Sequence, residues 1–463
     1  MPGLAPLEIR ELPAPINFRK LIGPSFIFLG LGLGSGELIL WPYLVSRFGL
    51  GIIWAAALGV SLQFFMNMEI ERYALLHGES VFVGFARKWK WAPVWFLIST
   101  LIPWIWPGII GTGAVLWANV LGIKQAHYLT IVLLVLIGLI LTLGPVVYSI
   151  QEKTQRTFIL IGAPFMLLLA AILAKGIDWL ALARGLVGQG EGYAFLPMSI
   201  PLASFLAAFA YSGSGGNLNL AQSYYIREKG YGMGQFMGRI TSVVTGKAEK
   251  WRLTGMKCDC TAEDVSRFRR WWKLMNLEHG LIFWLAGLIT ILLISLLAYS
   301  TTYGRELGAV QGVNFVIAEA DVIGQKLTPV VGIVFLLVVG LFLFGTQLSV
   351  MDASSRILAE NTLLLLPKLG ESKLRQLFYV ALWTQIGAGI AVLSLGMREP
   401  LLLLTIGAVL NAVAMLVHTA LMLRMNTTSL AKVWQPSWVR RVVLGGAIMI
   451  FAGFSGFSLM QLL

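Results

Sequence analysis

The side chain best placed to do chemistry in this sequence is Glu37, a carboxylate inside a long apolar stretch. It directly follows Gly34-Ser35-Gly36 and precedes Pro42 by five residues, a run that should interrupt a helix. Backbone groups freed by such a break must be satisfied by protein, water or a substrate when no bulk water is present. A carboxylate placed there could bind a cation directly, carry a proton, or lock the break by accepting hydrogen bonds from exposed amides.

The same device recurs later, where Tyr211-Ser212-Gly213-Ser214-Gly215-Gly216-Asn217 interrupts another apolar stretch. Paired interruptions in corresponding positions indicate an inverted-repeat transporter, whose broken helices meet around the substrate. Close helix packing by small residues is the alternative explanation, but it accounts poorly for a carboxylate on the first break. We therefore expect a binding site formed by the Glu37 carboxylate, the carbonyls of Gly34 and Tyr211, and the side-chain oxygens of Ser214 and Asn217.

The composition describes a polytopic membrane protein. Of 463 residues, 57% are hydrophobic and 12% are charged, against about 25% charged in soluble domains. The net charge of +13 follows from basic residues scattered between apolar runs, so we expect no nucleic acid partner. The two cysteines, Cys258 and Cys260, lack the spacing of a zinc site and suit a reducing compartment.

Eleven apolar runs are long enough to cross a bilayer. We expect a cytoplasmic segment at 1–20, a first repeat of five spans over about 21–174, a second repeat over about 200–423, and an extra span at 439–462. The expected span cores are 21–46, 50–74, 93–121, 127–148, 157–174, 200–225, 275–298, 328–352, 376–396, 399–423 and 439–462.

The basic residues predict the orientation. With the N-terminus inside, the inner segments hold 28 of the 35 Lys and Arg residues, including a basic loop at 227–273. Positively charged loops stay in the cytoplasm, which places the C-terminus outside, and we expect the plasma (inner) membrane. The run of Arg, Trp and Lys at 267–273 is typical of an interfacial anchor.

Few other polar groups lie in or near the spans. Glu69 and Glu71 stand next to Arg72 and are expected to form an ion-paired helix end, and Asp352 stands four residues before Arg356, a helix pair spacing. We expect Glu278 and His279 at the interface, keep Asn411 as a weak site candidate, and interpret His418 as packing.

Several motifs resemble those of the Nramp family of divalent metal transporters. They are Gly23-Pro24-Ser25-Phe26, the segment from Leu62-Gln63 to Arg72 and Gly78, Gly111-Thr112, and Asn217-Leu218 with Leu220. The resemblance covers roughly residues 20–460 and implies an all-α LeuT-type fold. That fold has 11 transmembrane helices, a 5+5 inverted repeat plus one helix, and breaks in helices 1 and 6.

The ligand motifs depart from those of the family. Gly34-Ser35-Gly36-Glu37 stands where the family has Asp-Pro-Gly-Asn, so the aspartate ligand is missing and Glu37 replaces the asparagine. Aligned on Asn217-Leu218, Ser214 takes the position of the family's methionine, and alignment on the Gly-Ser-Gly motif shifts this by one residue. The thioether is absent in either alignment, which weakens any preference for soft metals. Residues 93–121 contain no acidic residue, so proton coupling by the family's route is not expected.

These observations predict a secondary transporter that moves a cation by alternating access. A divalent metal ion of the Mg or Mn class, held by Glu37, Gly34, Tyr211 and Ser214, is the first hypothesis. The alternative is an amino acid or another small organic or monovalent cation. A channel or a membrane-embedded enzyme is disfavoured because no filter-like loop or catalytic set is evident. We expect no cofactor, and we expect the transported solute and the lipid bilayer as partners, with a monomer compatible with the sequence.

Overall fold

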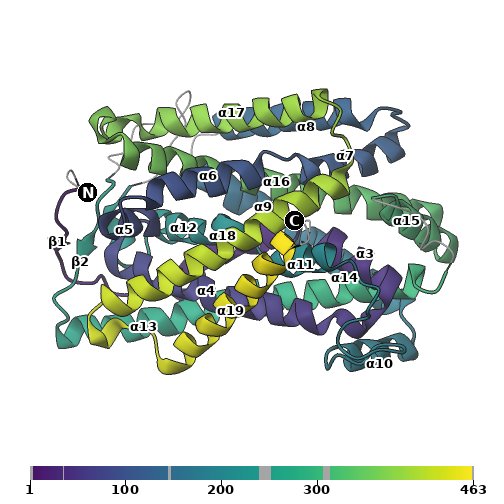
Figure 1. Cartoon of the computed structure of the whole chain (residues 1–463), viewed down its shortest axis with the longest axis horizontal. Coiled ribbons are helices and arrows are strands. Elements are labelled where there is room, and N and C mark those ends of the chain that lie inside the picture. The colour runs from purple at the N-terminus through teal and green to yellow at the C-terminus, as the bar shows by residue number, and fades with distance from the viewer. Residues whose placement is uncertain (1–3, 35, 144–146, 239–251, 306–312, 461–463) are drawn as a thin grey trace.

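The computed structural model describes residues 4–34, 36–143, 147–238, 252–305 and 313–460 and is built almost wholly from helices. Most of the long helices run along one common direction (Figure 1). The N-terminal segment, the strand pair β1 and β2, and the start of α13 lie at one end, while α10 and α15 lie at the other. β1, Glu8–Ile9, pairs in parallel with β2, Met256–Lys257. The bundle therefore has one end that carries the N-terminus and an opposite end that carries short connecting helices.

Ten helical segments of the described chain, some made of consecutive helices joined end to end, are long and apolar enough to cross a membrane. Their positions agree with the spans expected from hydropathy, and the remaining expected span is broken into two short helices. The helices are α1 Phe18–Leu21, α2 Pro24–Gly32, α3 Trp41–Phe48, α4 Trp54–His77, α5 Val81–Lys88, α6 Ala92–Trp104, α7 Gly108–Leu121, α8 Ala126–Leu143, α9 Val147–Leu173, α10 Gly176–Gly185, α11 Leu202–Ala210, α12 Gln222–Lys229, α13 Ala262–His279, α14 Ala286–Thr302, α15 Asn314–Lys326, α16 Pro329–Leu365, α17 Leu374–Ser394, α18 Pro400–Thr428 and α19 Trp438–Met460.

Both expected interruptions are present, which confirms the prediction of two broken spans. The first span consists of α2, a break, the short π-helix η1, Gly36–Leu40, and α3. The other broken span, five spans later, consists of α11, an irregular stretch, the 3-10 turn η3, Gly216–Ala221, and α12. Ser35, part of the first motif, lies outside the described residues.

The seventh span begins earlier than hydropathy indicates. α13, the π-helix η5, Gly280–Leu285, and α14 form a continuous helical segment from Ala262 to Thr302. Its start is defined by a capping box, in which Thr261 accepts the Asp264 amide and Asp264 accepts the Thr261 amide. The end of the basic loop is therefore helical, and its residues 239–251 lie outside the described part of the chain.

The N-terminal segment packs across the start of α13. The Leu12 amide donates to Asp264 Oδ1 at 2.8 Å, and Trp271 Nε1 donates to the Pro13 carbonyl at 2.8 Å. Trp271, expected as part of an interfacial anchor, is fully buried under this segment. These contacts hold the chain before the first span against the seventh span.

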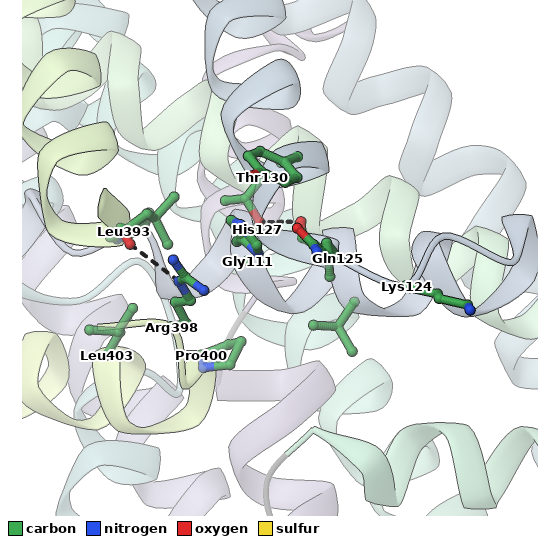
Figure 2. A pocket seen from close by; sticks show the side chains of 13 residues that line it. Gly111, Lys124, Gln125, His127, Thr130, Leu393, Arg398, Pro400 and Leu403 are labelled. Carbon is green, nitrogen blue, oxygen red and sulfur yellow. Dashed lines mark hydrogen bonds between the residues drawn. The ribbon is translucent and has the colours of Figure 1, made fainter. Parts of the chain in front are cut away.

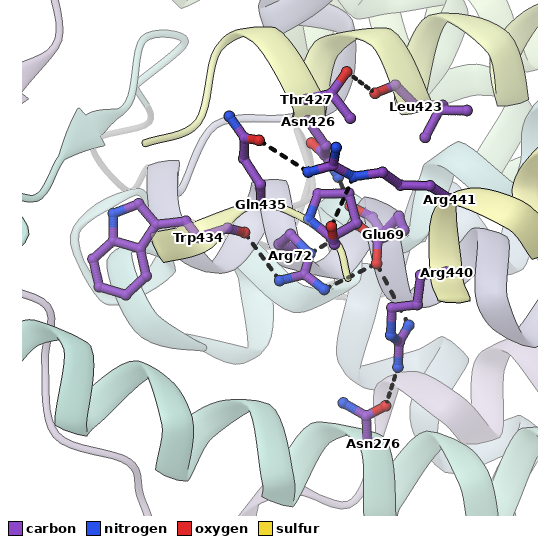
Figure 3. A network of polar contacts seen from close by, with 11 residues as sticks. Glu69, Arg72, Asn276, Leu423, Asn426, Thr427, Trp434, Gln435, Arg440 and Arg441 are labelled. Carbon is purple, nitrogen blue, oxygen red and sulfur yellow. Dashed lines mark hydrogen bonds and ion pairs between the residues drawn. The ribbon is translucent and has the colours of Figure 1, made fainter. Parts of the chain in front are cut away.

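Figure 3 shows the ion-paired network around Glu69 in the C-terminal half of α4. Glu69 is held by Arg72 Nε at 2.8 Å and by Arg440 Nη1 at 3.5 Å, and Asn426 Nδ2 donates to it at 3.0 Å. The expected pair of Asp352 with Arg356 is also present, at 2.8 Å. The expectation for Glu71 is wrong, because Arg72 turns to Glu69 instead.

A pH-dependent contribution to stability is expected from Glu319 on α15. Burial raises the pKa of Glu319 from 4.5 to about 8, and the Thr301 hydroxyl lowers it by less. Because the folded state binds this proton more tightly, the stabilisation is present below pH 4.5 and is lost as the pH rises through 8. Between these limits Glu319 should reduce the free energy of unfolding by up to about 1.4 kcal/mol per pH unit.

Thermal unfolding in detergent from pH 5 to pH 9 tests this expectation. The unfolding temperature of Glu319→Gln should fall less over this range than that of the wild type. Equal pH slopes for the two proteins would show that Glu319 does not hold a proton in the folded state.

Candidate substrate site at two helix breaks

The break in the first span is stabilised by Thr346 from α16. Thr346 Oγ1 lies 2.7 Å from the Gly30 carbonyl and 3.3 Å from the Leu33 carbonyl, two acceptors that the interrupted helix leaves free. The Gly34 carbonyl accepts the Leu38 amide at 3.0 Å, and a Cβ at Gly34 would meet the Thr346 side chain at 2.4 Å. Glycine is thus required at this position by the close approach of α16.

Glu37 follows the break on η1 and is 1% exposed. Its Oε2 accepts a hydrogen bond from Thr290 Oγ1 on α14 at 2.9 Å, and no other polar partner is present in the described part of the chain. Its Oε1 lies 3.2 Å from the position that a Cβ would take at Gly32, and 3.7 Å from the corresponding position at Gly287. The carboxylate therefore has one hydroxyl partner in the described part of the chain and faces the glycine backbone at Gly32 and Gly287.

The break in the other broken span is bridged by Gln63 from α4. Gln63 Nε2 donates to the Ala210 carbonyl at 3.0 Å, and its Oε1 accepts the Gly215 amide at 3.2 Å. Gly215 has a φ of 72° and Gly216 a φ of 55°, so both adopt the left-handed conformation that favours glycine. One amide side chain thus satisfies a freed acceptor on one side of the break and a freed donor on the other.

The two breaks contact each other directly. A Cβ at Gly36 would lie 1.7 Å from the Tyr211 carbonyl oxygen, and a Cβ at Gly32 would lie 3.3 Å from the Cα of Gly213. The glycines on both sides therefore allow the two backbones to approach. The Tyr211 carbonyl, one of the expected ligands, points at the backbone of the first break.

The other expected site residues bind different partners. The Tyr211 ring stacks on Trp104 with centroids 5.7 Å apart, and its hydroxyl accepts Asn411 Nδ2 at 2.9 Å. Ser214 donates to Asn219 Oδ1. Asn217 Nδ2 lies 2.8 Å from Ser99 Oγ and 3.0 Å from Thr100 Oγ1 on α6.

The structure brings Glu37, the Gly36 backbone and the Tyr211 carbonyl together, while Ser214 and Asn217 hydrogen-bond to other residues. Sequence reasoning did not identify Gln63, Thr290 or Thr346 as part of this region. Each is a polar residue within an apolar helix, and Gln63 also belongs to one of the motifs that resemble the Nramp family, but neither signal assigned these residues to the breaks.

No group of three or more His, Cys, Asp or Glu residues that could hold a metal ion is present among the described residues. Cys258 and Cys260 are both free, and Cys260 Sγ accepts a hydrogen bond from Trp434 Nε1 at 2.8 Å. Any metal ion bound near Glu37 would therefore rely on this single carboxylate, neutral oxygens and water.

A cavity of about 450 Å³ lies elsewhere, between the α7–α8 connection and the α17–α18 connection. Figure 2 shows Lys124 and His127 on one part of its wall and Arg398, held by the Leu393 carbonyl, on another. Its basic side chains make it unsuitable for a cation. The carboxylate at the helix breaks is thus the better candidate for cation binding.

No protein-family model and no curated protein sequence matches this chain. Solved structures do. A mutant of the Eremococcus coleocola manganese transporter has a TM-score of 0.69 at 13% identity, covering 99% of this chain and 90% of that chain. The arrangement of the spans is thus similar to a known architecture over nearly the whole chain. The chain has the LeuT fold.

Two further LeuT-fold structures are similar over nearly the whole chain. A nucleobase-cation-symport-1 family transporter in a closed conformation with bromovinylhydantoin bound has a TM-score of 0.57 at 13% identity, covering 99% of this chain and 95% of that one. MhsT in complex with L-phenylalanine has a TM-score of 0.53 at 14% identity, covering 93% and 98%. These neighbours are transporters and not enzymes, and they establish the fold of this chain, not its substrate.

Proposed function

We propose that this protein is a secondary transporter of the LeuT fold that moves a cation by alternating access. The observation that carries the proposal is Glu37, a buried carboxylate between two contacting helix breaks with a single hydroxyl partner in the described chain. A carboxylate at such depth is costly unless it is used for function. Glu37 supplies the negative charge that a cation requires, and the breaks supply backbone oxygens.

We propose a divalent metal ion of the Mg or Mn class as the substrate, in a divergent member of the Nramp family. The carboxylate of Glu37 and the oxygens of Gly34, Tyr211 and Ser214 are hard ligands, which suit these ions. The similarity to a manganese transporter supports this proposal. One carboxylate leaves a net positive site around a divalent ion, so the ion would keep part of its water.

Calorimetry on the purified protein tests the substrate class. Mg, Mn, Ca and Zn should be titrated first, followed by a panel of amino acids and organic cations. Saturable heat with Mg or Mn is the expected result. Heat with an organic ligand and none with any metal would overturn the metal proposal and keep the transporter proposal.

An amino acid or a small organic or monovalent cation is the second candidate. Tyr211 and Trp104 form a stacked aromatic pair next to the breaks, and such faces attract organic cations. Two of the similar transporters were solved with L-phenylalanine and with bromovinylhydantoin bound. The carboxylate of Glu37 would then pair with an ammonium group.

We propose that transport proceeds without the proton pathway of the Nramp family. The span formed by α6 and α7 has no acidic residue. In liposomes that contain a pH-sensitive dye, substrate uptake should therefore leave the internal pH unchanged. Addition of a protonophore is the control in which the dye should report a change of pH. Acidification that depends on substrate would contradict this proposal.

We further propose that the chain lies in the plasma (inner) membrane with its N-terminus in the cytoplasm and its C-terminus outside. The excess of basic residues in the segments on the N-terminal side supports this orientation. The expected partners remain the transported solute and the lipid bilayer, and a monomer is compatible with the fold.

A further inference from the structure

A connected series of four buried polar side chains links α2 of the first span to α4 and α13. Ser25 on α2 donates to Glu278 Oε2 on α13, and Ser25 Oγ lies 2.8 Å from His279 Nδ1. His279 Nδ1 lies 3.5 Å from Glu71 Oε1 on α4. All four residues are at most 1% exposed. Glu278 and His279 are thus buried within the protein, and they do not open the span, because its helix already begins at Ala262.

Neither carboxylate of this group, Glu71 or Glu278, forms an ion pair with an Arg or Lys side chain of the described residues. Glu69, on the same helix as Glu71, is paired with Arg72 at 2.8 Å and with Arg440 at 3.5 Å (Figure 3). Glu71 instead accepts Gln222 Nε2 at 2.5 Å, and its Oε2 has no hydrogen-bond partner within the described residues. The adjacent Nε2 of His279 is also buried without a partner there.

The charged side chains around these four residues already form ion pairs with other residues. Lys229 pairs with Glu152 at 2.7 Å and forms no ion pair with Glu278. Two carboxylates in an apolar interior without a paired cation cannot both be ionised at low cost. The titratable groups facing the four residues from the packed elements are Tyr148 and Glu152 on α9, Lys229 on α12, Tyr231 after α12, and Arg440 on α19.

We propose that Glu71 and Glu278, linked through His279 and Ser25, form a proton-binding site that holds one proton in this packed arrangement. A hydroxyl can donate on one side and accept on the other, so Ser25 connects Glu278 with the imidazole. The imidazole in turn reaches Glu71. A proton fits this site better than a metal ion, because no metal-binding group of three such residues occurs in the described chain.

The site is built onto the inner half of the first broken span. The amides of Gly23 and Ser25, at the start of α2, each donate to Glu278 Oε1 at 3.4 Å. Separation of α2 from α13 would expose both carboxylates to water, where they ionise and release the proton. The equilibrium between packed and separated α2 would then change by about tenfold per pH unit, with alkaline pH favouring separation.

The proton site reaches one side of the membrane only. His279 stacks on Phe283 with centroids 4.6 Å apart, and Phe283 lies 3.1 Å from the position of a Cβ at Gly213 in the other break. The Phe283 ring therefore lies between His279 and the second helix break. Lys229 and Glu152, beside Gly23, are 18% and 19% exposed and mark the side from which protons exchange. The site therefore does not move protons across the membrane, and it does not depend on the proposed substrate.

Infrared difference spectroscopy at pH 7 tests the proposal without any transport measurement. The spectrum of the wild type minus that of Glu71→Gln/Glu278→Gln should contain the carbonyl band of a protonated carboxyl, because an ordinary glutamic acid, with a pKa of about 4.3, is ionised at this pH. All other carboxyl groups cancel in the difference. Bands of two carboxylates and no acid band would overturn the proposal.

Two further variants keep the test decisive if the double variant does not fold. Ser25→Ala retains both carboxyls and removes only the connecting hydroxyl, so the acid band should shift in frequency, and an unchanged band would overturn the linkage. Glu319→Gln is the matched control. Burial raises the pKa of Glu319 to about 8, so this variant should lose one acid band that differs from that of the proposed site.

Discussion

Glu37→Gln should weaken substrate binding by about 100-fold or more and abolish transport, while the protein still folds. Even groups that act behind a metal ligand contribute about 10- to 100-fold to affinity, so a direct ligand should reach at least the upper value. The amide keeps the shape of the side chain and can still contact Thr290, but it loses the charge. Calorimetry with the ligand that binds the wild type measures the loss.

The structure provides a matched control for this substitution. Glu319 is also a buried carboxyl with a threonine hydroxyl near it, Thr301 at 3.4 Å, but it lies on α15 away from the breaks. Glu319→Gln should bind substrate as the wild type does. Normal transport by Glu37→Gln would rule out a direct role of this carboxylate.

Thr290→Val separates a ligand role of Glu37 from a role in locking the break. This variant keeps the carboxylate and removes its hydrogen-bond partner, which donates at 2.9 Å. If Glu37 binds the substrate, Thr290→Val should retain most of the affinity that Glu37→Gln loses. If Glu37 only holds the half-helices, the two variants should behave alike.

Gly36→Ala should destabilise the protein by about 1–3 kcal/mol and strongly reduce transport. The new Cβ would lie 1.7 Å from the Tyr211 carbonyl, a backbone atom that cannot rotate away. The two breaks must then move apart, which changes the spacing of the groups proposed to hold the substrate. Thermal unfolding in detergent and transport in liposomes measure the two effects.

Gly111→Ala is the control for the added methyl group. Its Cβ would meet Pro400 at 3.6 Å, an ordinary contact, so stability and transport should change little. Equal behaviour of the two alanine variants would show that the close approach of the breaks is not required.

The segmental composition of the chain was enough to predict the membrane class, the spans and the two breaks. These features depend on local properties, namely runs of apolar residues and the clustering of glycine and serine around Glu37 and Ser214. The ion pair of Asp352 with Arg356 was predictable for the same reason, because helix geometry alone brings residues four apart together.

The contacts between distant segments could not be predicted in this way. Glu69 and Glu71 look alike in the sequence, yet the cation Arg440, far along the chain, approaches Glu69 and leaves Glu71 to Gln222. The hydropathy of the sequence predicted that the seventh span opens near His279. The helix in fact begins at Ala262, after a capping box that hydropathy does not detect.

The sequence by itself thus determined that the chain crosses the membrane, where its helices are interrupted, and that Glu37 marks the first interruption. Only the tertiary structure decided which groups satisfy the freed backbone, because Thr346, Gln63 and Thr290 come from helices distant in the sequence. It also decided that Glu71 and Glu278 share one buried site. Local periodicity governs which segments become helices, whereas side-chain partners depend on how those helices pack.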